Sequence, residues 1–371
     1  MAAEEEEPRI DDLFSRMSSV GASDLHLKAG NPPVFRIDGT LRRLKGKSLS
    51  AAHIEALARD WLGDEKVDRI MEQGSMDFGH EFEGGRVRVS VFMQRGRISL
   101  VARLVENVVP SREELHLPED LLRMVDFNEG LCLVCGITGV GKSTTLAWLL
   151  NEMNKKHRRN ILTFEDPIEF VYEDANSIIN QREYRLDFHD WPEAIRAGVR
   201  ADPDVMLIGE MRGQETFKLC LTAAETGHLV LTTMHTSSVK ATFGRILDFF
   251  PTERHKFIRQ SLAFNLKAII CQRLVPSFRD EVQRVPAVEM MWVNPPIRKA
   301  IAEGDDARVE DLVQEGEEEG MQSWTTSFVK LIQQDFVTKK VAREFAPNKD
   351  ALEMALKGIS FSSSSRSSSG D

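Results

Sequence analysis

The feature that most constrains the fold of this 371-residue chain is a glycine-rich run, Gly136-Ile-Thr-Gly-Val-Gly-Lys-Ser-Thr144. Five apolar residues at 131–135 precede it, and apolar residues at helical spacing follow it. A strand, a glycine-rich turn and a helix in this order predict an α/β domain in which helices cover a mainly parallel sheet. Three further apolar runs predict other strands of that sheet, at 160–164, 205–208 and 229–232.

The same run matches the Walker A pattern, and its context of strand and helix supports the match. Its glycines let the backbone curl so that N–H groups face phosphates, and the following helix adds the positive end of its dipole. We expect Lys142 to pair with the β and γ phosphates of ATP and the Ser143 hydroxyl to bind Mg²⁺. The residues expected to bind the nucleotide are Gly136, Thr138, Gly139, Gly141, Lys142, Ser143 and Thr144.

Hydrolysis also needs a group that orients the attacking water. Glu210 follows the apolar run 205–208, so it is predicted at the carboxyl edge of the sheet, where open α/β sheets bind ligands. We therefore assign the orientation of the attacking water to Glu210. An ordinary Walker B strand carries aspartate just before this glutamate, and Gly209 stands there instead. Mg²⁺ would then depend more on Ser143, water and other carboxylates.

Two more carboxylates, Glu165 and Asp166, leave the end of the strand predicted at 160–164. We assign them to the positioning of metal-bound water, because they reach the same edge of the sheet as Glu210. The pair Asp166-Pro167 is also a common start of a turn, and this alternative stays open.

Two histidines, His228 and His235, flank the strand predicted at 229–232. In this fold the end of such a strand lies close to the γ-phosphate, so we assign both to phosphate sensing. A lone histidine is more often structural, and that alternative stays open.

The first 105 residues have the pattern of a small α+β domain. Apolar residues recur at helical spacing from Ile10 to Met17 and again from about Ala51. Asp38-Gly39, between runs at 34–37 and 40–44, predicts a tight hairpin. Alternating apolar residues at 87–91 and 98–104, on either side of an Arg-Gly-Arg turn, predict a second hairpin with one wet face.

Composition sets the limits of the other predictions. The net charge of −10 is the wrong sign for gripping nucleic acid over a broad surface. No apolar stretch approaches the ~20 residues of a membrane helix, and the acidic start lacks a signal-peptide pattern, so we expect a cytoplasmic protein. The predicted divisions are a disordered acidic start (1–8), an N-terminal domain (9–105), a linker (106–118), an ATPase domain with C-terminal helices (119–350) and a disordered serine-rich tail (351–371).

The four cysteines include one pair, Cys132 and Cys135, with the spacing of a redox or zinc site. The pair lies in an apolar run, and no second such pair exists in the sequence. We therefore expect these thiols, with Cys220 and Cys271, to be buried apolar residues.

Four motifs in order resemble those of the type II/IV secretion ATPases, and within that group the type IV pilus retraction ATPases (PilT and, especially, PilU). The resemblance covers roughly residues 9 to 345. The motifs are the Walker A run, an Asp box (Phe164-Glu-Asp-Pro-Ile-Glu169), an atypical Walker B (Leu207-Ile-Gly-Glu-Met-Arg212) and a His box (Ala224-Glu-Thr-Gly-His-Leu-Val-Leu-Thr-Thr-Met-His-Thr236).

This resemblance implies a PAS-like N-terminal domain joined to a RecA-like P-loop ATPase domain, in a homohexamer with ATP between subunits. It implies that both histidines of the His box are functional. It also implies that Arg88, Arg95 and Arg103 reach a nucleotide at a subunit interface. The implied work is pilus retraction and twitching motility. The resemblance further implies that the motor acts on a platform protein of the bacterial inner membrane. It implies that the motor lies at the cytoplasmic face of that membrane and is attached to it only through partners.

One segment departs from the family pattern. Retraction motors of the PilT type carry Ala-Ile-Arg-Asn-Leu-Ile-Arg-Glu, where this chain has Pro296-Ile-Arg-Lys-Ala-Ile-Ala-Glu303. The departure favours an accessory motor that works beside a second retraction ATPase. The alternative is a nucleotide-dependent regulatory or scaffold subunit that does not need its own turnover.

Overall fold

The computed structural model describes residues 9–105, 108–211 and 213–358, which form two compact units. The first unit contains the chain up to Val109 together with 164–173 and 181–194. The second contains 110–163, 174–180 and the chain from Ile195 onward. The predicted start (1–8), part of the linker (106–107) and the end of the tail (359–371) lie outside the described residues. Within the described ranges, every helix is too short or too polar to cross a membrane.

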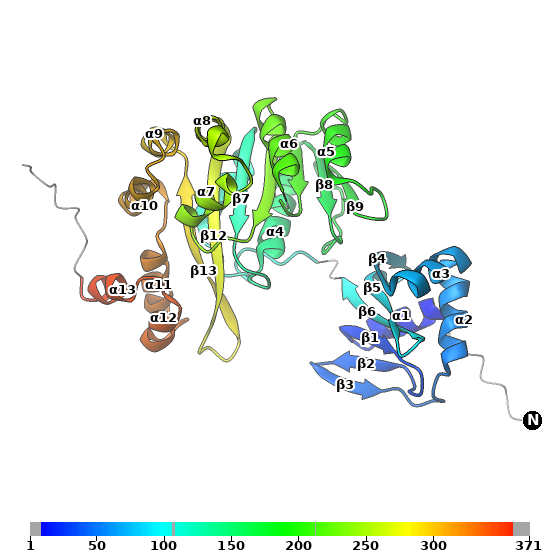
Figure 1. The fold of residues 1–371 in the computed structure, drawn as a ribbon. Coiled ribbons are helices and arrows are strands. Elements are labelled where there is room, and N and C mark those ends of the chain that lie inside the picture. The colour runs from blue at the N-terminus through cyan, green and yellow to red at the C-terminus, as the bar shows by residue number, and fades with distance from the viewer. Residues whose placement is uncertain (1–8, 106–107, 212, 359–371) are drawn as a thin grey trace, which may run out of the picture. The chain divides into compact units, whose positions relative to one another are not determined.

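The N-terminal sheet has six antiparallel strands in the order β3-β2-β1-β6-β5-β4 (Figure 1). Three helices accompany it, and their apolar residues pack with those of one sheet face in a single core. The strands are β1 (Asp24–Leu27), β2 (Val34–Ile37), β3 (Thr40–Arg43), β4 (Ser75–Phe82), β5 (Gly85–Gln94) and β6 (Arg97–Val105). The helices are α1 (Ile10–Ser19), α2 (Ala51–Leu62) and α3 (Asp64–Gln73).

Both predicted hairpins are confirmed. Asp38 and Gly39 connect β2 to β3 with φ of 48° and 74°, the left-handed values that a two-residue hairpin turn requires. Arg95 and Gly96 connect β5 to β6 in the same way, with φ of 53° and 70°. Alternation along β5 buries its valines in the core and leaves Arg88 exposed on the other face.

The second sheet has seven strands in the order β13-β12-β7-β11-β10-β8-β9 (Figure 1). The central pairs β12-β7, β7-β11 and β11-β10 are parallel, and β13 is antiparallel to β12. The four predicted strands are confirmed, and so is the α/β fold class. The strands are β7 (Gly130–Cys135), β8 (Asn160–Glu165), β9 (Ile178–Glu183), β10 (Val205–Ile208), β11 (Leu229–Met234), β12 (Leu266–Pro276) and β13 (Arg284–Trp292).

Helices connect these strands, and β7, β10 and β11 are buried along their whole length. That burial explains their continuous apolar runs. All four cysteines are free thiols and buried, as expected. The helices are η1 (Glu119–Asp126), α4 (Lys142–Lys156), α5 (Trp191–Val199), α6 (Gln214–Glu225), α7 (Val239–Leu247), η2 (Thr252–Arg254), α8 (His255–Asn265), α9 (Pro295–Glu303) and α10 (Asp306–Glu315).

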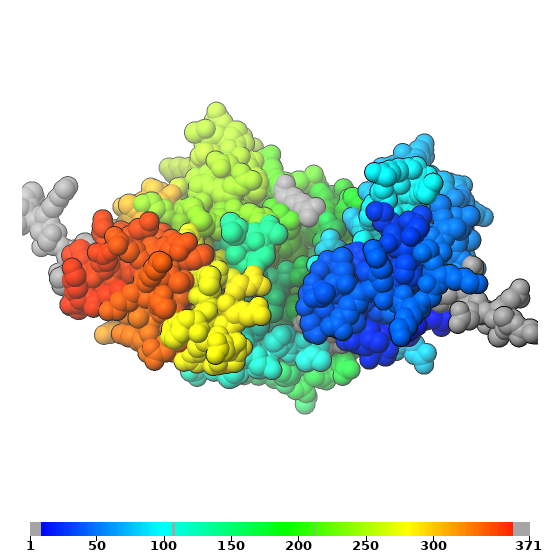
Figure 2. Space-filling view, turned by 90° about the horizontal axis from the view of Figure 1, so that it is seen from below, coloured from blue at the N-terminus to red at the C-terminus, as the bar shows by residue number. Residues whose placement is uncertain are grey.

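The last described residues form helices that pack beside the β12-β13 hairpin. They are η3 (Glu317–Glu319), α11 (Trp324–Gln333), α12 (Lys339–Phe345) and α13 (Lys349–Leu356). In Figure 2 these orange to red helices lie against the yellow hairpin, and the backbone N–H of Phe278 bonds the carbonyl of Phe336. The prediction of disorder from residue 351 was wrong for the first residues, because Asn348 caps α13 and Leu352 is buried.

Candidate functional site

The glycine-rich loop leaves β7 and enters α4 as the sequence predicts. At Gly136 φ is 151°, and an added Cβ would lie 2.6 Å from the carbonyl oxygen of Gln272 on β12. Gly141, the residue before α4, has φ of 87°. Only glycine tolerates both the close approach and the left-handed turn, so these two positions define the path of the loop.

Lys142 is the first residue of α4 and is buried. Its Nζ donates to the carbonyl oxygens of Gly136 at 2.8 Å and Ile137 at 3.1 Å. The positive charge therefore lies over the loop. Residues Ile137 to Gly139 and the Ser143 hydroxyl are exposed, so the outer side of the loop is open to a ligand.

A buried amide that the sequence analysis did not single out supports the loop from behind. The Nε2 of Gln272 donates to the carbonyl of Val140 at 2.8 Å, and its Oε1 accepts from the Thr145 hydroxyl at 2.8 Å. One side chain on β12 thus joins the loop to the helix after it. The available signal was a polar residue inside the apolar run of a long strand.

Glu210 and His235 lie at the same edge of the sheet as this loop. In the parallel register Met234 is opposite Cys135, and Ile208 is opposite Thr232. The residues that follow β7, β10 and β11 therefore emerge side by side. His235 Nε2 lies 3.2 Å from Glu210 Oε1, and their side chains are 44% and 30% exposed.

The turn that carries Glu210 is also fixed. Thr233 on β11 donates its hydroxyl to the carbonyl of Gly209 at 2.6 Å, and the N–H of Met211 bonds the carbonyl of Thr233. The Glu210 side chain therefore projects from a turn that these two hydrogen bonds hold in place.

His228 does not join this group. It precedes β11, whose first residue Leu229 is opposite Gly130 at the start of β7. Six strand residues separate it from the carboxyl edge, which corresponds to about 20 Å at the usual rise per residue. Its Nδ1 lies 2.9 Å from the carbonyl of Ala223 and 3.1 Å from the Thr226 hydroxyl. His228 and His235 therefore lie at opposite ends of β11, and the phosphate-sensing role of His228 stays a prediction.

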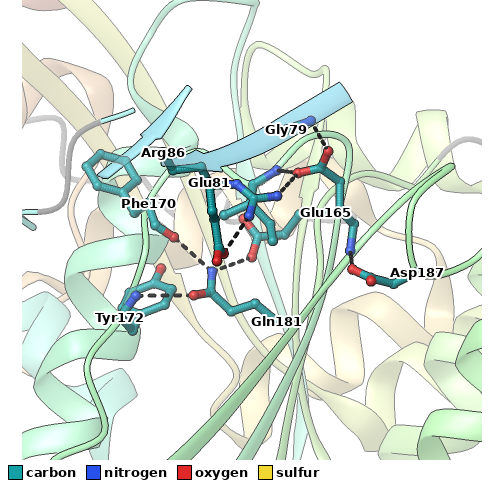
Figure 3. Close-up of polar contacts among 10 residues, drawn as sticks. Gly79, Glu81, Arg86, Glu165, Phe170, Tyr172, Gln181 and Asp187 are labelled. Atoms are coloured by element: carbon teal, nitrogen blue, oxygen red, sulfur yellow. Dashed lines mark hydrogen bonds and ion pairs between the residues drawn. The ribbon is translucent and has the colours of Figure 1, made fainter. Parts of the chain in front are cut away.

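Glu165 is the last residue of β8 and is buried, whereas Asp166 is exposed. Gln181 on β9 donates its amide to Glu165 Oε1 at 3.1 Å (Figure 3). The peptide bond between Asp166 and Pro167 is cis. Both carboxylates belong by their contacts to the first unit, with segment 164–173.

The three arginines lie on the β5-β6 hairpin and are exposed. Arg88 and Arg103 are opposite each other, and Arg95 is in the turn. Arg103 Nε lies 2.7 Å from an oxygen of Asp24. Burial acts to raise the pKa of Asp24, but hydrogen bonds from Arg103 and Ser23 outweigh it, and the pKa is lowered.

The donors at the sheet edge fit Mg²⁺ bound to a nucleotide. Mg²⁺ prefers oxygen, keeps several waters and commonly takes one or two protein ligands besides phosphate oxygens. The exposed Ser143, whose side chain ends in a hydroxyl, supplies a ligand of that kind. Among the described residues there is no group of three or more histidine, cysteine, aspartate or glutamate side chains that could hold a metal ion.

Comparisons with known proteins agree with this geometry. The family described as type II/IV secretion system protein matches residues 3–312. The chain is 40% identical to the type IV pilus retraction ATPase PilT of Pseudomonas aeruginosa over 338 residues, which cover 91% of this chain and 98% of the relative. It is 33% identical to the type IV pilus ATPase PilU of that bacterium over 346 residues, which cover 93% and 90%. Identity is higher with this PilT than with this PilU.

Solved structures show the same relationship. The crystal structure of the pilus retraction motor PilT with bound ADP matches with a TM-score of 0.86 and 38% identity, over 94% of this chain and 99% of that one. The X-ray structure of the Legionella pneumophila ATPase DotB matches with a TM-score of 0.80 and 26% identity, over 96% and 98%. The chain therefore belongs to the type II/IV secretion system protein family and is an ATPase of that family.

Proposed function

We propose that this chain is the ATPase motor of a type IV pilus retraction machine and serves twitching motility. The observation that carries the proposal is the P-loop with Glu210 and His235 beside it, in a chain that matches PilT and PilU over more than nine-tenths of its length. The site supports the proposal of ATP hydrolysis, and the named relatives support the proposal that hydrolysis drives pilus retraction.

Each group at the sheet edge has a proposed role in hydrolysis. Backbone N–H groups of the loop and the Lys142 ammonium bind the phosphates, and Ser143 holds Mg²⁺, which neutralises charge on the phosphate oxygens. Glu210 orients the attacking water, and His235 holds Glu210 and senses the γ-phosphate. Glu165 and Asp166 position water on the metal. Thr138 and Thr144 complete the phosphate-binding loop.

The remaining proposals concern assembly. Six copies form a ring with ATP between subunits, and Arg88, Arg95 or Arg103 of a neighbour offsets charge on the phosphoryl group. The two domains of a subunit close when ATP binds and reopen after hydrolysis, and these movements follow one another around the ring. The ring acts on a platform protein at the cytoplasmic face of the inner membrane and reaches the membrane through that partner.

The segment Pro296–Glu303 lies in α9 and differs from the retraction motif at half of its positions. On this ground we propose an accessory motor that works beside a second retraction ATPase. The higher identity with PilT than with PilU gives no support to this finer proposal. A direct comparison with and without the second ATPase is therefore needed.

Two measurements test the proposal. The purified protein should hydrolyse ATP, and Lys142→Ala and Glu210→Gln should each remove that activity; hydrolysis that survives both variants contradicts it. In cells that make type IV pili, loss of the chain should reduce pilus retraction and twitching. Retraction by this chain in a strain without the second ATPase would make it an independent motor rather than an accessory one.

A further inference from the structure

One buried ion pair joins two parts of the first unit that are far apart in sequence. Glu183, the last residue of β9, is 1% exposed, and its Oε2 lies 2.7 Å from Nη2 of Arg86 on β5. Backbone N–H groups of Gly79 and Ile168 also donate to this carboxylate, at 2.5 Å and 3.1 Å. Three donors therefore surround one carboxylate that has little access to water.

The N-terminal sheet is shaped to receive this carboxylate. Gly79 on β4 has no left-handed φ, yet an added Cβ would lie 2.4 Å from Arg86 Nη2 and 2.7 Å from Glu183 Oε2. Glycine is therefore required there for space, not for backbone conformation. The other guanidinium branch of Arg86 meets Glu81, whose side chain is 76% exposed.

The same carboxylate lies next to the segment that carries Glu165 and Asp166. Ile168, which donates to Glu183, follows Asp166 by two residues. On the other side, the N–H of Tyr184 bonds the carbonyl of Glu165 at 2.8 Å. Tyr184, the residue after Glu183, therefore holds the end of β8 through its backbone.

Gln181 completes this arrangement. Its Nε2 donates to Glu165 Oε1 at 3.1 Å and to the carbonyl of Phe170 at 2.8 Å, and its Oε1 accepts the N–H of Tyr172 at 3.1 Å (Figure 3). The end of β9 thus holds the loop from Glu165 to Tyr172 by hydrogen bonds. Through Glu183, the same strand end is bonded to Gly79 of β4 and Arg86 of β5.

We propose that Arg86 and Glu183 are positioning residues that fix the loop bearing Glu165 and Asp166 to the N-terminal sheet. The loop is then held at its start by β8 and farther along by the N-terminal sheet through Glu183, so the ion pair sets the geometry of the groups proposed to handle the metal-bound water. A buried ion pair suits this task, because it contributes little net stability but tolerates only one geometry. The inference rests on the proposed function, since it gives a purpose to the roles proposed for Glu165 and Asp166.

The test is steady-state ATP hydrolysis by full-length Arg86→Lys, Arg86→Met and Glu183→Gln variants. We expect kcat to fall about 10- to 100-fold for Arg86→Met and Glu183→Gln, as for other residues that orient a reacting group. KM for ATP and the affinity for ADP should stay close to wild type, because the P-loop is untouched. Arg86→Lys keeps the charge and should recover part of kcat.

Glu81→Gln is the matched control. It removes the negative charge of the exposed partner of Arg86 and leaves the contact with Glu183, so kcat should be unchanged. Gly79→Ala should reproduce the loss of Glu183→Gln, because the added methyl group occupies the space of the ion pair. The double variant Arg86→Met with Glu183→Gln should lose no more than either single change, since both break one contact.

The outcomes separate this inference from the proposed function. All rates are measured at a temperature where thermal unfolding shows every variant folded. If Lys142→Ala and Glu210→Gln abolish hydrolysis but Glu183→Gln and Gly79→Ala hydrolyse ATP at the wild-type rate, the positioning role is overturned and the ATPase stands. A parallel loss of kcat, ATP affinity and ADP affinity also overturns it, because that pattern indicates general damage to the fold. If wild-type protein hydrolyses no ATP, the proposed function fails first.

Discussion

Two glutamates at strand ends have opposite surroundings. Glu210 follows β10, its side chain is 30% exposed, and it pairs with the still more exposed His235. Glu183 ends β9, is 1% exposed, and is held by Arg86 and two backbone N–H groups. A carboxylate that must meet a ligand needs an open side, whereas one that holds chain segments together needs all its donors from the protein. Burial and partners, not residue type, distinguish the two sites.

The largest expected effect is at the open site. Glu210→Gln keeps the size of the side chain but removes the charge that orients the attacking water, so kcat should fall about 10³-fold with ATP affinity retained. ATP turnover and nucleotide binding measured on one preparation check this. Glu303→Gln, an exposed change on α9, is the control. A smaller loss for Glu210→Gln than for Glu183→Gln would reverse the comparison.

The order should invert when stability is measured. Glu183→Ala leaves the Arg86 guanidinium buried beside two unsatisfied N–H groups and should lower the free energy of unfolding by about 3 kcal/mol. Glu210→Ala removes a partly exposed side chain and should change it by less than about 0.5 kcal/mol. Urea denaturation of the two variants gives both values. Equal losses would show that the burial difference has no energetic consequence.

The two histidines of the His box sharpen the comparison further. His235→Ala removes the group 3.2 Å from Glu210, and kcat should fall about 10²-fold. His228→Ala removes a side chain at the other end of β11, where its partners are Ala223 and Thr226, so kcat should change little. Turnover of the two variants at saturating ATP is the measurement. A matching loss at His228 would mean that it reaches a nucleotide of another subunit.

A third glutamate, Glu289 on β13, is buried and accepts the N–H of Val239 at 2.7 Å. Burial raises the pKa of Glu289 to about 7, above its ordinary value of 4.5. Between these pH values the folded state binds more protons than the unfolded state, so stability falls as pH rises from 4.5 to 7 and is level above. Glu289→Gln should therefore stabilise the protein by about 2 kcal/mol at pH 8 and much less at pH 5. Denaturation curves of wild type and variant at the two pH values check this.

The sequence predicts what depends on neighbours in the chain. Asp38-Gly39 specifies its hairpin locally, and the run from Gly136 to Thr144 specifies a phosphate loop, because turn and cap requirements fall on consecutive residues. The register of the parallel strands then determines which residues lie together at one edge of the sheet. It places His228 and His235 at opposite edges, although the two histidines flank one strand.

The contacts of Glu183 could not be predicted in this way. Arg86 lies 97 residues away in sequence, and β9 is a polar edge strand with no apolar run. Periodicity does indicate that alternate residues of β5 are outside the core, so Arg86 and Arg88 belong to one face. It does not indicate that a distant carboxylate covers the first and leaves the second exposed. That difference requires the tertiary fold.

The amide of Gln272 has a consequence for nucleotide entry. Its two hydrogen bonds, to the Val140 carbonyl and the Thr145 hydroxyl, are made by protein atoms alone and lie in the core behind the loop. Releasing a buried amide of this kind costs about 1 to 3 kcal/mol, so the curved path of the loop is set while the chain folds. The loop therefore has its curved conformation before a triphosphate binds, and the entropy lost in ordering the loop is part of the free energy of folding and not of binding.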